Sequence, residues 1–174
     1  KMVHSKLKSS GTRDLKNNLN DLRAQVAANQ KGIVLMTNLI AEYSLKIVVD
    51  YMKHVQDNCE HAVRDLLRSV YKSRNLSKDR PLVCNDFMDD GSEIRLSIAI
   101  DGETGDAEFD FAGTSNEVYG NINAPKAITF SAIIYSLRCL VDRDIPLNQG
   151  VMAPITVKIP HPSFLSPTSV VGVG

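Results

Sequence analysis

The sequence has few of the residues and motifs that commonly point to a function. Tryptophan is absent, and aromatic residues make up only 6% of the chain. The three cysteines, Cys59, Cys84 and Cys139, form no CxxC pair, so we expect small reduced thiols and a cytoplasmic location rather than a disulfide framework. No apolar run approaches the roughly 20 residues that span a bilayer, and no apolar segment follows the basic start. We therefore expect neither a membrane segment nor a signal peptide.

Motifs of nucleophilic and phosphate chemistry are also missing from the sequence. The patterns G-x-S-x-G, H-E-x-x-H and G-x-x-x-x-G-K-[ST] do not occur. Two groups of side chains contain residue types that bind metals, but they are better interpreted as solvated surface. One lacks EF-hand spacing, and the other lies on the polar face of a predicted helix. The first group is Asp86, Asp89, Asp90 and Glu93, and the second is His54, Asn58 and His61.

The net charge is zero, but the charges are unevenly distributed. Residues 1–80 carry a net charge of +7, residues 81–119 carry −9, and residues 120–174 carry +2. The basic part has no cationic cluster with interleaved aromatic residues, which a nucleic-acid interface would need, so we expect no nucleic-acid partner. The acidic middle part indicates a solvated face or a polar interface.

Residues 14–74 have the periodicity of two long helices. Apolar side chains recur at steps of three and four along residues 15–40 and again along residues 45–70, which is typical of one apolar stripe on each helix. Asp14 is suited to cap the first helix, and Ser44 interrupts the pattern where the second begins. We therefore expect a long antiparallel helical hairpin with buried stripes.

The period changes to two in the acidic part. Apolar and polar residues alternate in residues 94–100 and 107–111, and the turn sequence DGETGD joins them at residues 101–106. This pattern predicts a β-hairpin with one apolar face. Residues 82–87 are expected to add a third strand, and residues 155–159 form a further short strand.

The stretch VYGNINAPKAITFSAIIYSLRCL begins as a polar turn and ends as an apolar run. It predicts a helix at residues 125–141 that is buried on most sides. Its main stripe is expected to be Ile128, Ala132, Tyr135 and Cys139. Asn121 and Asn123 precede this helix, where they either shape the loop and cap the helix or, as free amides at a helix start, hold an anion or a carbonyl group. The residues alone leave both interpretations open.

The chain resembles the hydantoinase B/oxoprolinase family. The resemblance is carried by NLNDLRAQVAANQKGI, DDGSEIRLSIAI, FDFAGTSNEVYGNINAPKAITFSAIIYSLRCLV and DIPLNQGVMAPITVKIP, which follow one another in the family's order. It extends from about residue 11 to the last residue. Within the family, SGTRDL and VDRDIPLNQG are most similar to the eukaryotic-type 5-oxoprolinases.

The resemblance implies a reaction for a longer protein of which this chain is an interior fragment. Such enzymes couple ATP hydrolysis to the opening of 5-oxo-L-proline to L-glutamate, and they use Mg-ATP and a divalent cation. The nucleotide-binding half and the family's metal-binding region lie outside these residues. We therefore expect the isolated chain to be inactive, with no catalytic residue, no metal site and no cofactor of its own. Its expected partners are the remainder of the enzyme and 5-oxo-L-proline.

Four residues become candidates for substrate binding once the resemblance is counted: Thr114, Asn121, Asn123 and Asn29. Asn29 lies in the apolar stripe of the first helix, where a buried amide setting the helix register is an alternative role. Two other functions stay open. The chain is either a non-catalytic structural or subunit-interaction module, with homo-oligomers among its assemblies, or a relative that acts on hydantoins or ketones.

The expected architecture is α+β, with the helical hairpin followed by a β-hairpin or small sheet and one buried helix. The organisation is a lead-in at residues 1–13, the helical hairpin at residues 14–74 and an α+β part at residues 81–174. The last part is expected to be truncated at its C-terminal end, because a Gly-rich apolar piece follows with no closing element.

Overall fold

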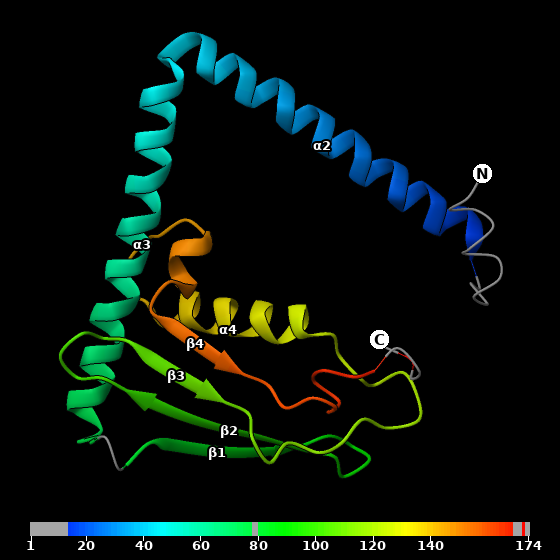
Figure 1. Ribbon diagram of the computed structural model, residues 1–174, viewed down its shortest axis with the longest axis vertical. Coiled ribbons are helices and arrows are strands. Elements are labelled where there is room, and N and C mark those ends of the chain that lie inside the picture. Colours follow the sequence, from blue (N-terminus) through cyan, green and yellow to red (C-terminus); the bar gives the residue numbers. More distant parts are fainter. Residues whose placement is uncertain (1–13, 78–79, 169–171, 173–174) are drawn as a thin grey trace. The chain divides into compact units, whose positions relative to one another are not determined.

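A computed structural model describes residues 14–77, 80–168 and 172. The predicted lead-in and the apolar C-terminal piece lie mostly outside these residues. The predicted α+β class is confirmed, with two long helices followed by a small mixed sheet and one further helix (Figure 1). The chain divides into two compact units, Lys1–Met52 and Lys53–Gly174, and each is described by itself.

Helix α2, Leu15–Tyr43, makes up most of the described part of the first unit. It begins as predicted, because the Asp14 carboxylate accepts a hydrogen bond of 3.1 Å from the backbone N–H of Asn17. At its other end, the N–H of Ser44 donates to the carbonyl of Ile40 at 2.9 Å. No residue of α2 is buried, so the expectation of a buried stripe on this helix is wrong for the described residues.

Helix α3, Leu45–Ser73, changes character along its length. Its first residues belong to the first unit and leave their apolar side chains exposed. Within the second unit it buries one face, which consists of Cys59, Ala62, Val63 and Leu67. Only the second half of the predicted stripe therefore contributes to a core.

The sheet has four strands in the order β1-β2-β3-β4. Strands β1, Leu82–Phe87, and β2, Glu93–Ile100, pair antiparallel, as do β2 and β3, Ala107–Asp110. All three coincide with predicted strands. In the register Leu82 lies opposite Ile98, and Ile98 lies opposite Phe109, so these apolar side chains share one face.

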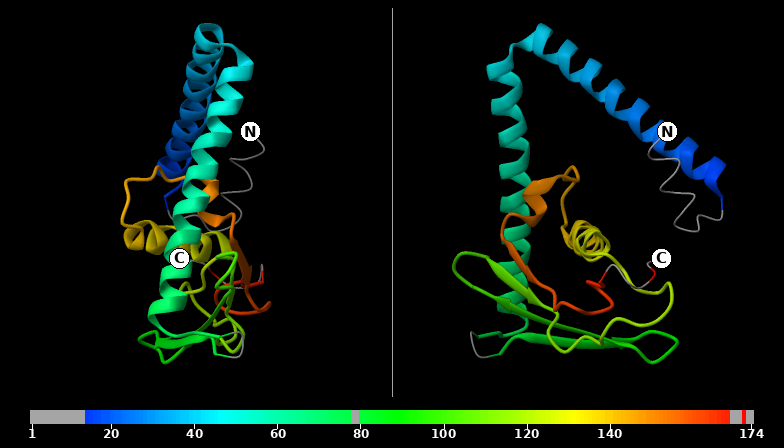
Figure 2. Two further views of the ribbon diagram at one scale, coloured as in Figure 1. Left: turned by 90° about the vertical axis from the view of Figure 1, so that its left-hand side faces the viewer. Right: turned by 45° about the vertical axis from the view of Figure 1, so that its right-hand side comes forward.

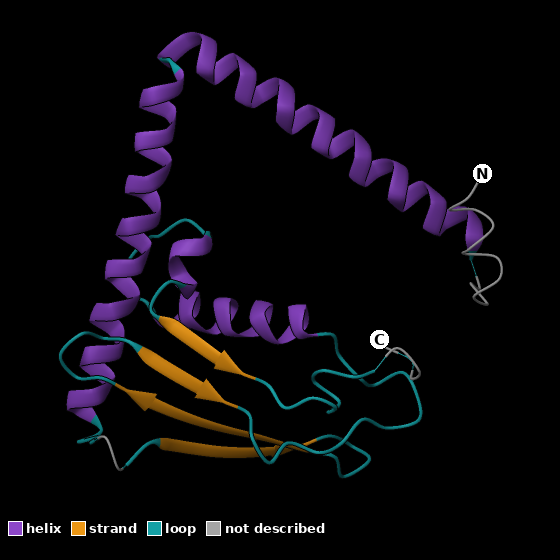
Figure 3. Ribbon diagram, viewed as in Figure 1, coloured by secondary structure: helices purple, strands orange, loops and turns teal. Residues whose placement is uncertain are grey.

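Strand β4, Ile155–Lys158, pairs parallel to β3, which the sequence did not predict. Helix α4, Lys126–Leu140, forms the crossover between them, followed by the short 3-10 helix η1, Gln149–Met152. Figure 3 shows α4 along one face of the sheet. β3, α4 and β4 therefore form a β-α-β unit attached to an antiparallel hairpin.

Arg64 fastens the β2–β3 turn to α3. Its guanidinium donates to the carbonyl of Thr104 at 2.9 Å and to the Asp106 carboxylate at 2.7 Å. Hydrogen bonds from the Thr104 side chain and from Arg64 lower the pKa of Asp106 from its ordinary value of 3.8. The turn end of the hairpin is thus held against a helix, while the opposite end of the sheet carries the loops described next.

Candidate functional site

The loops at the carboxyl ends of β3 and β4 form the candidate site. The two strands are parallel, so residues 111–125 and 159–168 leave the sheet at the same edge, where α4 also begins (Figure 2). In sheets with parallel strands, ligands bind at this edge. The sequence-predicted residues Thr114, Asn121 and Asn123 all lie in the first of these loops.

Thr114 is buried, and its hydroxyl group both accepts and donates a hydrogen bond to the backbone of β2. Its hydroxyl accepts a hydrogen bond of 3.1 Å from the N–H of Arg95 and donates at 3.2 Å to the carbonyl of the same residue. Ser115 continues this pattern, since its N–H donates to the carbonyl of Glu93 at 2.9 Å and its hydroxyl accepts from the N–H of Glu93 at 2.9 Å. The loop therefore starts from a fixed position on the sheet.

Asn123 organises the second half of the loop. Its side chain is almost completely buried, and Oδ1 accepts from the N–H of Val118 at 2.9 Å. Nδ2 donates to the carbonyls of Val118 at 2.9 Å, Gly120 at 3.2 Å and Gly172 at 2.7 Å. Both ends of the amide are thus committed to the protein backbone, which agrees with the interpretation of Asn123 as a residue that shapes the loop.

The second loop is tied to the first by side-chain and backbone contacts. The Glu117 carboxylate accepts from the N–H of Thr168 at 2.6 Å and from its hydroxyl at 3.0 Å. The carbonyl of Phe164 accepts from the N–H of Ala124 at 2.6 Å, and the Phe164 side chain is buried. The edge is therefore a preorganised surface rather than two independent loops.

The contacts of His161 define the tautomer of its neutral imidazole ring. Nδ1 lies 2.8 Å from the carbonyl oxygen of Ser166 and 3.1 Å from its hydroxyl. A carbonyl oxygen only accepts, so Nδ1 carries the hydrogen in the neutral ring and Nε2 keeps the lone pair. The residue is exposed, so Nε2 is available as an acceptor at this edge.

Asn121 differs from its neighbours because its side chain is exposed. Tyr119 in the same loop is also fully exposed. Amide, phenol and imidazole groups of this kind can orient a small polar ligand by hydrogen bonds.

Asn29 lies in α2, within the first unit, and its side chain is exposed. The structure brings Thr114, Asn121 and Asn123 into one loop, whereas Asn29 belongs to a unit described separately. A role in substrate binding stays a prediction for all four residues.

Within residues 14–77, 80–168 and 172, no group of three or more His, Cys, Asp or Glu side chains is arranged to hold a metal ion. In the acidic cluster, the N–H and hydroxyl of Ser92 bond to the Asp90 carboxylate at 2.9 and 3.0 Å and lower its pKa. Glu93 accepts from Asn85 at 2.6 Å. The described donor set therefore does not fit the divalent cation that the family resemblance implies.

Two residues of the edge were not among the sequence-predicted candidates, namely Glu117 and His161. Glu117 accepts a hydrogen bond from the backbone N–H of Thr168, 51 residues further along the chain, and no local sequence pattern indicates such a contact. His161 lies between Pro160 and Pro162, and the available signal was its position two residues after a predicted strand. Their contributions depend on the parallel pairing of β3 and β4.

Comparison with known proteins gives consistent matches along the chain. The hydantoinase B/oxoprolinase family model matches residues 2–174. An uncharacterized protein of Schizosaccharomyces pombe is 57% identical over 164 residues, which cover 94% of this chain. 5-oxoprolinase 1 of Arabidopsis thaliana is 53% identical over 168 residues, covering 92% of the chain, and 5-oxoprolinase of Saccharomyces cerevisiae is 48% identical over 160 residues, also covering 92%.

The matched region is a small part of each relative. It corresponds to 12% of the S. pombe and S. cerevisiae proteins and to 13% of the A. thaliana protein. The chain thus corresponds to a segment of proteins named 5-oxoprolinase. Because the family model matches nearly the whole chain, the protein belongs to the hydantoinase B/oxoprolinase family.

Proposed function

We propose that this chain is part of an enzyme that couples ATP hydrolysis to the opening of 5-oxo-L-proline to L-glutamate. The observation that carries the proposal is the identity of about half of the residues to relatives named 5-oxoprolinase, over more than 90% of the chain. The substrate is a cyclic amide whose carbon–nitrogen bond is cleaved by water, so the reaction is a hydrolysis.

In this reaction the terminal phosphoryl group of ATP is transferred to the lactam oxygen, which makes the ring carbon electrophilic. ADP leaves at this step. Water adds to the activated carbon, the carbon–nitrogen bond breaks, and the nitrogen takes up a proton to become the amino group, which leaves an acyl phosphate of glutamate. A second water cleaves the acyl phosphate to the carboxylate of glutamate and free phosphate. We assign none of these bond changes to a side chain of this chain.

The role that we assign to this chain is substrate positioning at the carboxyl edge of β3 and β4. Asn121 is the residue best placed to touch the substrate, because its amide is exposed at the edge. Thr114 and Asn123 hold the loop through bonds to backbone and act as positioning residues. An amide group matches both polar groups of a lactam, since it donates to the carbonyl oxygen and accepts from the ring N–H.

The proposed setting is the cytoplasm, where the reaction belongs to glutathione metabolism. No single helix in the described residues is long and apolar enough to cross a membrane, although α2 and α3 reach the required length and apolar content when taken together across the break at Ser44. The proposed partners are the remainder of the enzyme, 5-oxo-L-proline and, in some assemblies, further copies of the chain.

An assay of ADP release tests the proposal. The purified chain and the full-length S. cerevisiae relative are incubated with Mg-ATP, with and without 5-oxo-L-proline, and binding to the chain is followed by calorimetric titration. We expect ADP release that depends on 5-oxo-L-proline from the full-length protein and none from the chain. Turnover by the chain alone would contradict its assignment as an incomplete part, and a full-length protein that ignores 5-oxo-L-proline would contradict the substrate.

A structural or subunit-interaction role is the second candidate, and one observation favours it. Helix α2 is 29 residues long and buries none of them, although its apolar side chains recur at helical spacing. Val26 is 69% exposed and Ile33 is 60% exposed, which is unusual for residues of an apolar stripe. The two candidates are compatible, because a segment of a larger enzyme can both position substrate and pack against its neighbours.

A further inference from the structure

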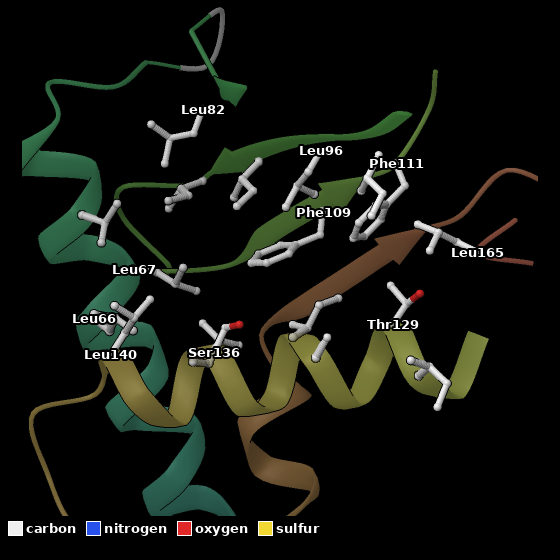
Figure 4. A pocket seen from close by; sticks show the side chains of 18 residues that line it. Leu66, Leu67, Leu82, Leu96, Phe109, Phe111, Thr129, Ser136, Leu140 and Leu165 are labelled. Atoms are coloured by element: carbon white, nitrogen blue, oxygen red, sulfur yellow. The ribbon is translucent and has the colours of Figure 1, made fainter. Parts of the chain in front are cut away.

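An apolar groove lies between helix α4 and the sheet (Figure 4). It has a volume of about 500 Å³, and its walls are almost entirely carbon. Side chains of β1, β2 and β3 form one wall and α4 forms the other, while Leu66 of α3 lies at one end and Leu165 at the other. We call this feature the α4 groove.

Helix α4 presents two parallel rows of side chains to this side of the sheet. The inner row, Thr129, Ile133 and Leu137, is buried. The outer row lies one residue earlier at each turn and lines the α4 groove, and it consists of Ile128, Ala132, Ser136 and Leu140. Ile128 is 54% exposed and Leu140 is 64% exposed. The prediction of a helix buried on most sides is thus wrong, because the described residues leave the outer row exposed.

The sheet is covered unevenly in the same way. Phe109 of β3 is buried, whereas Leu96 of β2 and Leu82 of β1 are only partly buried although they share its face. Helix α4 joins β3 to β4 and lies over their half of the sheet. Within the part of the chain that the structure describes, the half formed by β1 and β2 therefore lacks the covering layer that an apolar sheet face requires.

A buried hydroxyl without a partner points into the same region. Thr129 is 6% exposed, and its oxygen has no hydrogen-bond partner among the described residues. It lines the groove, and Figure 4 shows its oxygen on the side of α4 that faces the sheet. Leaving such a group unpaired in a buried position is costly.

We propose that the α4 groove holds an apolar helix supplied by polypeptide outside residues 1–174, as the longer family members provide. The S. cerevisiae relative matches the chain over only 12% of its length, so ample chain exists to supply it. The outer row has small residues, Ala132 and Ser136, between large ones. That arrangement allows two helix axes to approach within roughly 8–10 Å, with the i+4 row of α4 fitting the grooves of its neighbour.

The dimensions favour a helix over a small molecule. From Ile128 to Leu140 the outer row rises about 18 Å along the helix axis, which corresponds to a partner helix of about 12 residues. A small molecule would leave most of this length exposed, because ligand sites usually bury most of their ligand's surface. The occupant therefore presents apolar side chains to the groove.

Two matched glutamate substitutions test the proposal. Ala132→Glu places a charge in the groove, and Ala127→Glu places the same charge on the same helix outside it; both alanines are exposed in the chain. We expect both variants of the 174-residue chain to melt within a few degrees of the wild type, because exposed sites tolerate such changes. In the full-length S. cerevisiae relative, the substitution aligned with Ala132 is expected to abolish soluble expression or to lower Tm by about 5 °C or more, whereas the one aligned with Ala127 is tolerated.

Cysteine reactivity gives a second readout that does not depend on folding yield. With the exposed Cys84 and Cys139 first replaced by serine, a cysteine introduced at Ser136 is expected to react quickly with a maleimide in the chain. The same cysteine at the aligned position of the full-length relative, its other reactive cysteines also replaced, is expected to react at least tenfold more slowly. Equal rates in the two proteins, or equal tolerance of the two glutamates in the relative, would overturn the proposal. A dimer of the chain that Ala132→Glu disrupts in sedimentation experiments would overturn it too, because it would assign the groove to a second copy.

Discussion

Replacement of Asn123 by alanine should destabilise the second unit by about 3 kcal/mol. The side chain makes four hydrogen bonds of 2.7–3.2 Å and is 1% exposed. Each such bond contributes roughly 1 kcal/mol, and the buried N–H of Val118 would keep no other partner in the loop. Water entering the vacated space recovers a part of the loss, which brings the expected total down from about 4 kcal/mol.

The measurement is urea unfolding followed by far-UV circular dichroism, since the chain has no tryptophan. With a slope of about 2 kcal/mol per molar urea, a loss of about 3 kcal/mol moves the midpoint by roughly 1.5 M. Asn121→Ala is the matched control, because Asn121 is exposed two residues away and surface substitutions usually change stability by less than about 0.5 kcal/mol. Equal midpoints for the two variants would refute the reasoning.

Asn123→Asp adds a test with a distinct pH signature. The new carboxylate would face the carbonyl oxygens of Val118, Gly120 and Gly172, which Nδ2 contacts in the native protein. Burial beside these oxygens raises the pKa of the introduced carboxyl group above its unfolded value, so the folded state favours the protonated form. The variant should therefore gain stability relative to the native protein as the pH falls from 7 towards 4. A loss of stability that is the same at pH 7 and pH 4 would contradict the placement of this side chain beside the three carbonyl oxygens.

Three further predictions concern packing and charge in the second unit. Gly150→Ala should cost about 2–3 kcal/mol in urea unfolding, because the new Cβ would collide with the backbone carbonyl of Gln56; a neutral result would contradict this packing. Thr129→Val should stabilise the chain by about 1 kcal/mol, because it replaces an unpaired buried hydroxyl with a methyl group of similar size, and a loss of stability would show that the hydroxyl is paired in solution. The lowered pKa of Asp106 supplies stability above its unfolded pKa that is lost as the pH falls through the folded value. Asp106→Asn should therefore lower Tm at pH 6 but much less at pH 3, and an equal difference at both pH values would contradict the ion pair with Arg64.

The sequence predicted elements well where the signal is local. The helical period gave both long helices, and the Asp14 cap and the turn between residues 100 and 107 are present as expected. The parallel pairing of β3 with β4 was not predicted, because it joins segments about 48 residues apart and leaves no local pattern. That pairing brings the two loops of the candidate site together.

Burial was harder to predict than secondary structure. In α4 nearly every face is apolar, so periodicity could not decide which row faces the sheet. The expected stripe began at Ile128, whereas the buried row begins at Thr129. The role of Asn123 in shaping its loop was among the predicted alternatives, but its bond to Gly172 spans 49 residues and required the structure. The same two alternatives were open for Asn121, and its side chain is exposed in the structure.

The most direct test of the central claim is steady-state kinetics of the full-length S. cerevisiae relative with alanine at the position aligned with Asn121. The control carries alanine at the position aligned with Asn116, which is exposed in the same loop. If the carboxyl edge of β3 and β4 positions the lactam, the first variant should raise KM for 5-oxo-L-proline at least tenfold while its Tm and its KM for ATP stay unchanged, and the control should behave like the native enzyme. Unchanged kcat and KM for 5-oxo-L-proline in the first variant would contradict the placement of the substrate at this edge.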